Sequence, residues 1–290
     1  MRTRRFLSFA APVLVLACAS APPVPSAPES GSLPVEGGSL AYEVRGSGPE
    51  AVVLLHGGFG DRRMWDGQME PFARRFRVVR YDQRGFGASP APTAAYSPVA
   101  DLLRLLDHLG VARAHLVGNS MGASLALDAA LLHPDRFGKL VAAANGANGF
   151  PYTPEDTAGV VAVFQAAARE GTERAAELWL EHPMVKVTSR DPATAPLLRE
   201  MVTANRGIFL MRHWPAERLD PPAYERMGEL RNPVLFLVGE DDTPLVRRAA
   251  EETAARIPHA RKATLPGADH LPQMARPAEF NRVVLEFLEE

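Results

Sequence analysis

LVGNSMGAS at residues 116–124 contains Gly118-Asn119-Ser120-Met121-Gly122, a Gly-x-Ser-x-Gly pattern. An apolar strand is predicted directly before this pattern and a helix after it, which is the context that a nucleophile elbow requires. Glycines are needed in such a tight turn because larger side chains would collide, and the N-terminus of the helix favours negative charge. We therefore predict that Ser120 is a nucleophile.

The chain around this motif alternates between predicted strands and helices, which indicates βαβ units and a mostly parallel sheet. Strands are predicted at residues 39–45, 51–56, 76–81, 114–118, 139–144, 233–238 and 260–265, and helices at residues 97–109, 120–132, 244–257 and 277–288. Residues 150–228 interrupt this alternation with helical patterns and no convincing strand. We interpret that segment as a helical cap, or lid, inserted between two strands of the core.

A serine hydroxyl needs a base to take its proton, and the base needs a carboxylate to orient it. His270 follows the last predicted strand and therefore lies at the same sheet edge as Ser120. The other histidines are interpreted as structural. Glu240, Asp241 and Asp242 follow the strand at residues 233–238, and each could orient the base or cap the next helix.

Five spaced motifs resemble those of α/β-hydrolase superfamily serine hydrolases, in the group of cap-domain esterases and meta-cleavage-product hydrolases. The motifs are LLHGGFG (54–60), YDQRGFGAS (81–89), LVGNSMGAS (116–124), PVLFLVGEDD (233–242) and LPGADHLP (265–272). The resemblance implies an α/β-hydrolase fold, with a mostly parallel sheet of the eight-stranded type and helices on both faces. It also implies a core of residues 35–149 and 229–290, with a cap of residues 150–228 before the seventh strand.

The resemblance also implies roles for single residues. Asp242 is the acid of a Ser120–His270–Asp242 catalytic triad. The backbone N–H of Met121 and that of Gly58, with Phe59 as the alternative to Gly58, form the oxyanion hole. No metal and no cofactor is expected. Asp269 stands where a glycine often precedes the histidine of this family.

Together these assignments predict hydrolysis of carboxylic esters of small-molecule acyl substrates through an acyl-enzyme. A carbon–carbon hydrolase, a lactonase or an aminopeptidase of the same fold is the alternative, and a non-catalytic binding protein on this scaffold is a further one. Phe59, Trp179 and Trp214 are candidate substrate contacts, although aromatic residues of a cap also commonly form its core.

The N-terminus has the pattern of an export signal over residues 1–17, with three arginines followed by an uncharged apolar stretch. Cys18, the one cysteine of the chain, follows directly and resembles the lipidated residue of bacterial lipoproteins. The alternative is a plain secretory signal. Residues 19–34 contain five prolines, so residues 18–34 are predicted to be the lipidated cysteine and a Pro-rich tether.

These features predict an exported bacterial protein, held at a membrane through a lipid anchor only and facing the periplasm or the cell exterior. The 32 basic and 34 acidic side chains give a formal net charge of −2, which is unlike the basic surface of nucleic-acid-binding proteins. One cysteine also excludes a disulfide within the chain and a zinc site built from cysteines.

Overall fold

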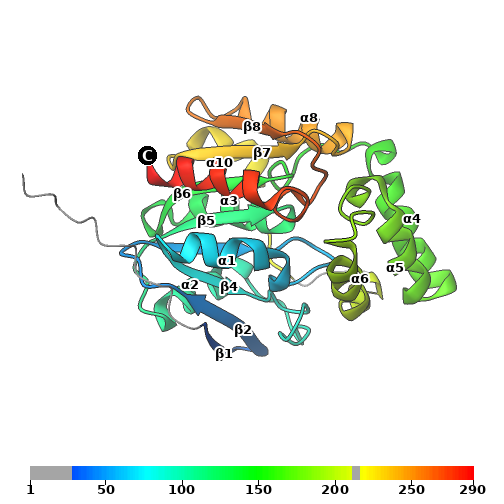
Figure 1. Cartoon of the computed structure of the whole chain (residues 1–290), viewed down its shortest axis with the longest axis horizontal. Helices are drawn as coiled ribbons and strands as arrows, with labels where there is room; N and C mark the ends of the chain where they lie inside the picture. Colours follow the sequence, from blue (N-terminus) through cyan, green and yellow to red (C-terminus); the bar gives the residue numbers. More distant parts are fainter. Residues whose placement is uncertain (1–27, 211–215) are drawn as a thin grey trace, which may run out of the picture.

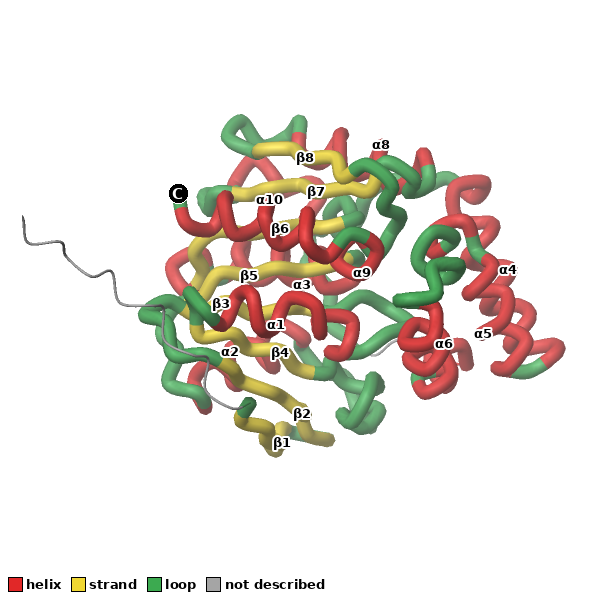
Figure 2. The backbone as a smooth tube through the Cα atoms, in the orientation of Figure 1, coloured by secondary structure: helices red, strands yellow, loops and turns green. Residues whose placement is uncertain are grey.

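The computed structural model describes residues 28–210 and 216–290. Its centre is an eight-stranded sheet with the strand order β1-β2-β4-β3-β5-β6-β7-β8 (Figures 1 and 2). The strands are β1 (Glu29–Val35), β2 (Gly38–Arg45), β3 (Ala51–Leu55), β4 (Arg77–Tyr81), β5 (Ala114–Asn119), β6 (Phe137–Ala143), β7 (Val234–Gly239) and β8 (Arg261–Leu265). The pairs β1–β2 and β2–β4 are antiparallel and the other pairs are parallel, as the alternation of strands and helices predicts.

Helices cover both faces of the sheet, so the central strands are buried on both sides. Apolar residues of α1 and α10, with part of α9, join one core cluster, and those of α2, α3 and α8 join mainly the other. The bounds are α1 (Asp66–Ala73), α2 (Pro98–His108), α3 (Met121–Leu132), α8 (Pro244–Ala254), α9 (Pro272–Ala275) and α10 (Pro277–Glu289). Short 3₁₀ turns are η1 (Arg62–Trp65), η2 (Pro134–Arg136), η3 (Pro183–Val185), η4 (Arg206–Leu210) and η5 (Met227–Glu229).

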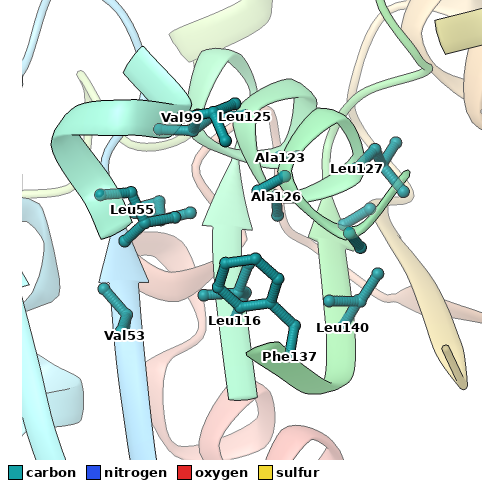
Figure 3. Packing of buried hydrophobic residues seen from close by; sticks show 14 of the residues in the cluster. Val53, Leu55, Val99, Leu116, Ala123, Leu125, Ala126, Leu127, Phe137 and Leu140 are labelled. Carbon is teal, nitrogen blue, oxygen red and sulfur yellow. The ribbon is translucent and has the colours of Figure 1, made fainter. Parts of the chain in front are cut away.

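The packing of α3 on the sheet fixes the position of the predicted nucleophile. All five residues of β3 are buried, and Val53 and Leu55 lie in the same cluster as Leu116 of β5. Figure 3 shows Ala123, Ala126 and other residues of α3 lying over these strands. Small alanines let the helix approach the sheet closely, and burying each leucine or valine contributes about 1.5–3 kcal/mol.

The structure differs from the predicted Pro-rich tether at its C-terminal end, because Glu29–Val35 form strand β1. This strand pairs with β2 along its whole length, through a turn in which Gly37 has a φ of 73°. Pro34 lies on the outer strand of the sheet, where its missing N–H is tolerated. Residues 18–27 of the predicted tether, which include Cys18, and the predicted signal peptide at residues 1–17 lie outside the described residues.

Residues 150–228, predicted to be the cap, connect β6 to β7. They contain α4 (Pro154–Glu170), α5 (Thr172–Glu181), α6 (Ala195–Ala204) and α7 (Ala223–Arg226), and the described part of the segment contributes no strand to the sheet. In Figure 1, α4, α5 and α6 lie together beyond the ends of the central strands. We call residues 150–228 the insertion below.

Candidate active site

The turn between β5 and α3 holds Ser120 in a strained backbone conformation, with a φ of 51° and a ψ of −114°. The Ser120 N–H donates to the carbonyl of Ala143 at 2.8 Å. A Cβ atom on Gly118 would lie 2.3 Å from the carbonyl oxygen of Gly122, and one on Gly122 would lie 2.1 Å from that of Leu55. Both glycines are therefore required by close contact, and the contact keeps the strained serine at the end of the strand.

The structure brings together Ser120, His270 and Asp242, which three different loops supply. His270 Nε2 lies 2.9 Å from Ser120 Oγ, and His270 Nδ1 lies 2.9 Å from Asp242 Oδ2. Asp242 is buried, whereas Glu240 and Asp241, the other two candidates for the acid, are exposed. The three side chains thus form a continuous series of contacts from the Asp242 carboxylate through the His270 imidazole to the Ser120 hydroxyl.

Two opposing effects act on the pKa of His270. Burial lowers this pKa, whereas the charge of Asp242, the hydrogen bond to Asp242 and the charge of Asp269 raise it, and the net result is a raised pKa. An imidazole with this surrounding can take a proton from Ser120 and hold the resulting positive charge next to a buried carboxylate.

Several contacts of the His270 loop were not predicted from the sequence. The His270 N–H donates to the carbonyl of Met184 at 3.0 Å, and Asn119 Nδ2 donates to the carbonyl of His270 at 2.9 Å. Asn119 is the variable residue that precedes Ser120 in the motif, so its proximity to the nucleophile could have identified it. Met184 belongs to the insertion, and nothing in the sequence indicates its contact with His270.

The predicted donors for an oxyanion lie at the same sheet edge. Gly58 and Phe59 follow β3 and line the same cavity as Ser120 and Met121. Phe59 has a φ of 62°, which turns the backbone of this loop sharply. Over residues 28–210 and 216–290, the N–H groups of Gly58, Phe59 and Met121 have no hydrogen-bond acceptor in the protein. All three groups are therefore free to donate to a bound ligand.

His56 supports this loop and lies outside the triad. Its Nδ1 is 2.8 Å from the carbonyl oxygen of Gly57, and its Nε2 accepts from the Gln83 N–H at 2.9 Å. Burial is the main cause of its lowered pKa, which keeps the ring neutral. A neutral ring with both nitrogens engaged is a structural brace.

A cavity of about 470 Å³ lies between Ser120 and the insertion. Most of its wall is apolar, and Phe59 and Trp179 line it, with their ring centroids 4.3 Å apart. Phe209 stacks on Phe59 from behind, with centroids 5.0 Å apart, and is itself buried. The aromatic residues of the insertion are thus divided between the cavity wall and the core, and Trp214 lies outside the described residues.

A second cavity of about 690 Å³ meets the first at Ser120 and Met121. Its wall carries more polar groups, among them Asp128, Asn148 and Arg218. Burial raises the pKa of Asp128 to about 6, and Asn148 Nδ2 donates to its carboxylate at 2.7 Å. Ser120 therefore stands between an apolar space and a more polar one.

The described part of the chain contains no group of three or more His, Cys, Asp or Glu side chains that could hold a metal ion. None of its helices is both long enough and apolar enough to cross a membrane.

Comparison with known proteins gives a consistent family. The sequence profile described as "Alpha/beta hydrolase family" matches residues 52–283. A 2-hydroxy-6-oxononadienedioate/2-hydroxy-6-oxononatrienedioate hydrolase of Pseudomonas putida is 31% identical over 273 residues, covering 86% of this chain and 91% of the relative.

Two solved structures are also similar. The enol-lactonase from Burkholderia xenovorans LB400 has a TM-score of 0.77 at 27% identity, covering 90% of this chain and 100% of the other. A thermophilic esterase from Thermogutta terrifontis has a TM-score of 0.76 at 28% identity, covering 90% of this chain and 98% of the other.

We predict that Ser120 reacts with an active-site-directed fluorophosphonate and that the rate falls as the pH is lowered through the raised pKa of His270. A protonated imidazole cannot accept the serine proton, so reactivity is present above this pKa and lost below it. The measurement is the labelling rate as a function of pH. His270→Ala should abolish labelling, whereas His259→Ala, which removes a histidine bonded to the distant Asn232 carbonyl, should not. Labelling that is independent of pH or of His270 would contradict this reading.

Proposed function

The chain belongs to the alpha/beta hydrolase family, and from this premise we propose that it hydrolyses carboxylic esters through a covalent acyl-enzyme on Ser120. The observation that carries the proposal is the pair of 2.9 Å contacts that link Ser120 Oγ through His270 to Asp242. A nucleophile, a base and an orienting carboxylate in contact are the parts that acyl transfer requires.

The first half of the reaction forms the acyl-enzyme. Ser120 Oγ bonds to the acyl carbon while its proton passes to His270 Nε2. The N–H of Met121 and that of Gly58 or Phe59 stabilise the oxyanion, and each such donor contributes about 3 kcal/mol. The bond to the alcohol oxygen then breaks, and that oxygen takes the proton from His270.

The second half releases the acid. Water gives a proton to His270 as its oxygen bonds to the acyl carbon. The bond to Ser120 Oγ then breaks, and the serine recovers its proton from the imidazole. Asp242 holds the imidazole in the required tautomer and stabilises its positive charge in both halves.

The two cavities suggest which part of an ester each would hold. The apolar cavity of about 470 Å³ fits a small or medium acyl chain, since ligand pockets commonly span about 300–1,000 Å³. The more polar cavity, with Asp128 and Arg218 in its wall, would take the alcohol part. An ester with an apolar acyl group and a polar alcohol fits this arrangement.

A lactonase or a carbon–carbon hydrolase is the second candidate. It is favoured by the similarity to the Burkholderia enol-lactonase and to the Pseudomonas 2-hydroxy-6-oxononadienedioate hydrolase. An aminopeptidase is less favoured, since proline iminopeptidases of this fold usually carry HGGPGG where this chain has HGGFGD at residues 56–61. A non-catalytic binding protein would not need all three members of the triad.

We predict that the full chain hydrolyses p-nitrophenyl esters with an optimum at one acyl chain length, because the apolar cavity has a fixed size. Ser120→Ala should lower kcat by several orders of magnitude without loss of folding. The measurement is kcat/KM across a series of acyl lengths, with circular dichroism as the control for folding. Hydrolysis that persists in Ser120→Ala would contradict the proposal. A folded, phosphonate-reactive chain that hydrolyses no ester would favour the lactone or carbon–carbon alternative.

We also propose that the chain is exported and anchored by lipid on Cys18, which lies outside the described residues. The support is the sequence pattern of residues 1–18. Cys18→Ser should move the protein from the membrane fraction to the soluble fraction when it is produced in a bacterial host. An unchanged membrane fraction would contradict the lipid anchor.

A further inference from the structure

Asp269 directly precedes His270 in the sequence, and its side chain points away from solvent. Asp269 is 0% exposed. Its Oδ2 accepts from the Thr188 N–H at 2.8 Å, and its Oδ1 accepts from the Thr188 hydroxyl at 2.7 Å and from the Leu271 N–H at 3.1 Å. A buried carboxylate is costly unless it is hydrogen-bonded, and here three donors offset part of that cost. Burial still raises the pKa of Asp269, against the lowering effect of these hydrogen bonds and of the charge of His270.

Thr188 belongs to the insertion, so this contact joins the insertion to the catalytic loop. Thr188 is also 0% exposed, and its carbonyl accepts from the Thr194 hydroxyl at 2.7 Å, just before α6 begins. Thr188 and Asp269 are 81 positions apart in the chain. The contact is thus a fixed connection between two parts of the molecule that the sequence separates widely.

A second connection lies beside the first. The His270 N–H donates to the carbonyl of Met184, which is in the same short segment of the insertion as Thr188. Asn119 Nδ2 holds the His270 carbonyl from the side of the sheet. The backbone of His270 is therefore held by the insertion on one side and by the elbow on the other.

We propose that Asp269 is a positioning residue that places His270 for proton transfer by joining the catalytic loop to Thr188 of the insertion. The inference rests on the proposed function, because it concerns the same triad. It assigns a role to the insertion beyond enclosing the substrate: the base is in place for Ser120 only when residues 184–188 are seated on the core. A loop held loosely would leave His270 near Ser120 but not aligned with it.

Asp269 also acts on His270 through its charge. The titratable groups that face His270 are Asp242 after β7, Asp269 after β8 and His182 at the end of α5. Burial lowers the pKa of His270, and Asp242 and Asp269 raise it. Burial, followed by the charge of His270, lowers the pKa of His182, so His182 adds little positive charge. Removal of the Asp269 charge should therefore lower the pKa of His270.

The test compares Asp269→Asn and Thr188→Val with the parent chain, on an ester that the parent hydrolyses. An asparagine side chain keeps the volume but has one acceptor oxygen, so it cannot satisfy donors at both carboxylate positions. We expect a kcat about tenfold to a hundredfold lower for Asp269→Asn with little change in KM, because the substrate cavity is intact. The acid limb of kcat/KM should move to lower pH, which a purely structural role would not cause.

Thr188→Val removes the hydroxyl and leaves the backbone N–H in place. It should lower kcat in the same direction, and Thr188→Ser should restore it. The double variant should lose less than the product of the two single losses, because both substitutions break one contact. Thr253→Val is the matched control, since Thr253 is also 0% exposed and its hydroxyl accepts from the Ala147 N–H, a contact that involves neither the insertion nor the loop of His270.

Two results would overturn the inference. One is a parent chain with Ser120-dependent hydrolysis whose kcat and acid limb are unchanged in Asp269→Asn. The other is a loss of kcat in Asp269→Asn that Thr253→Val matches, with both variants losing thermal stability to the same extent. Absence of Ser120-dependent hydrolysis in the parent chain would instead count against the proposed function.

Discussion

The backbone turn at Ser120 is the constraint on which the site depends. It joins β5 to α3 with a φ that a serine rarely adopts, and it survives because Gly118 and Gly122 let the helix approach the sheet without a Cβ in the way. The alanines of α3 maintain the same closeness further along the helix. Core packing thus supplies the energy that holds Ser120 in a strained position at the carboxyl ends of the strands.

The second requirement is a buried carboxylate beside His270. Asp242 Oδ2 lies 2.9 Å from His270 Nδ1, and both residues are buried. Asp269 adds a second buried carboxylate, which the insertion satisfies through Thr188. The core and the insertion therefore both affect the position and the charge of the His270 imidazole, although the cavity lies between them.

Much of this could be predicted from the sequence, for physical reasons. Strand and helix periodicity and the spaced motifs predicted the mostly parallel sheet, because those patterns are local. Three predicted residues, Ser120, Asp242 and His270, come together because the carboxyl ends of parallel strands meet at one edge. Strand β1 was missed, since Pro34 and its small and polar residues indicated a tether and only its pairing with β2 makes it a strand. The Asp269–Thr188 contact was missed because no local pattern links residues so far apart.

The proposed reaction places the acyl group on Ser120 during turnover. The most direct test is mass spectrometry of the chain quenched in acid while it hydrolyses an activated ester. We expect a mass increase of one acyl group, located on the peptide that contains Ser120 and absent from Ser120→Ala. Turnover without an adduct in the quenched chain, or an adduct on another residue, would contradict it.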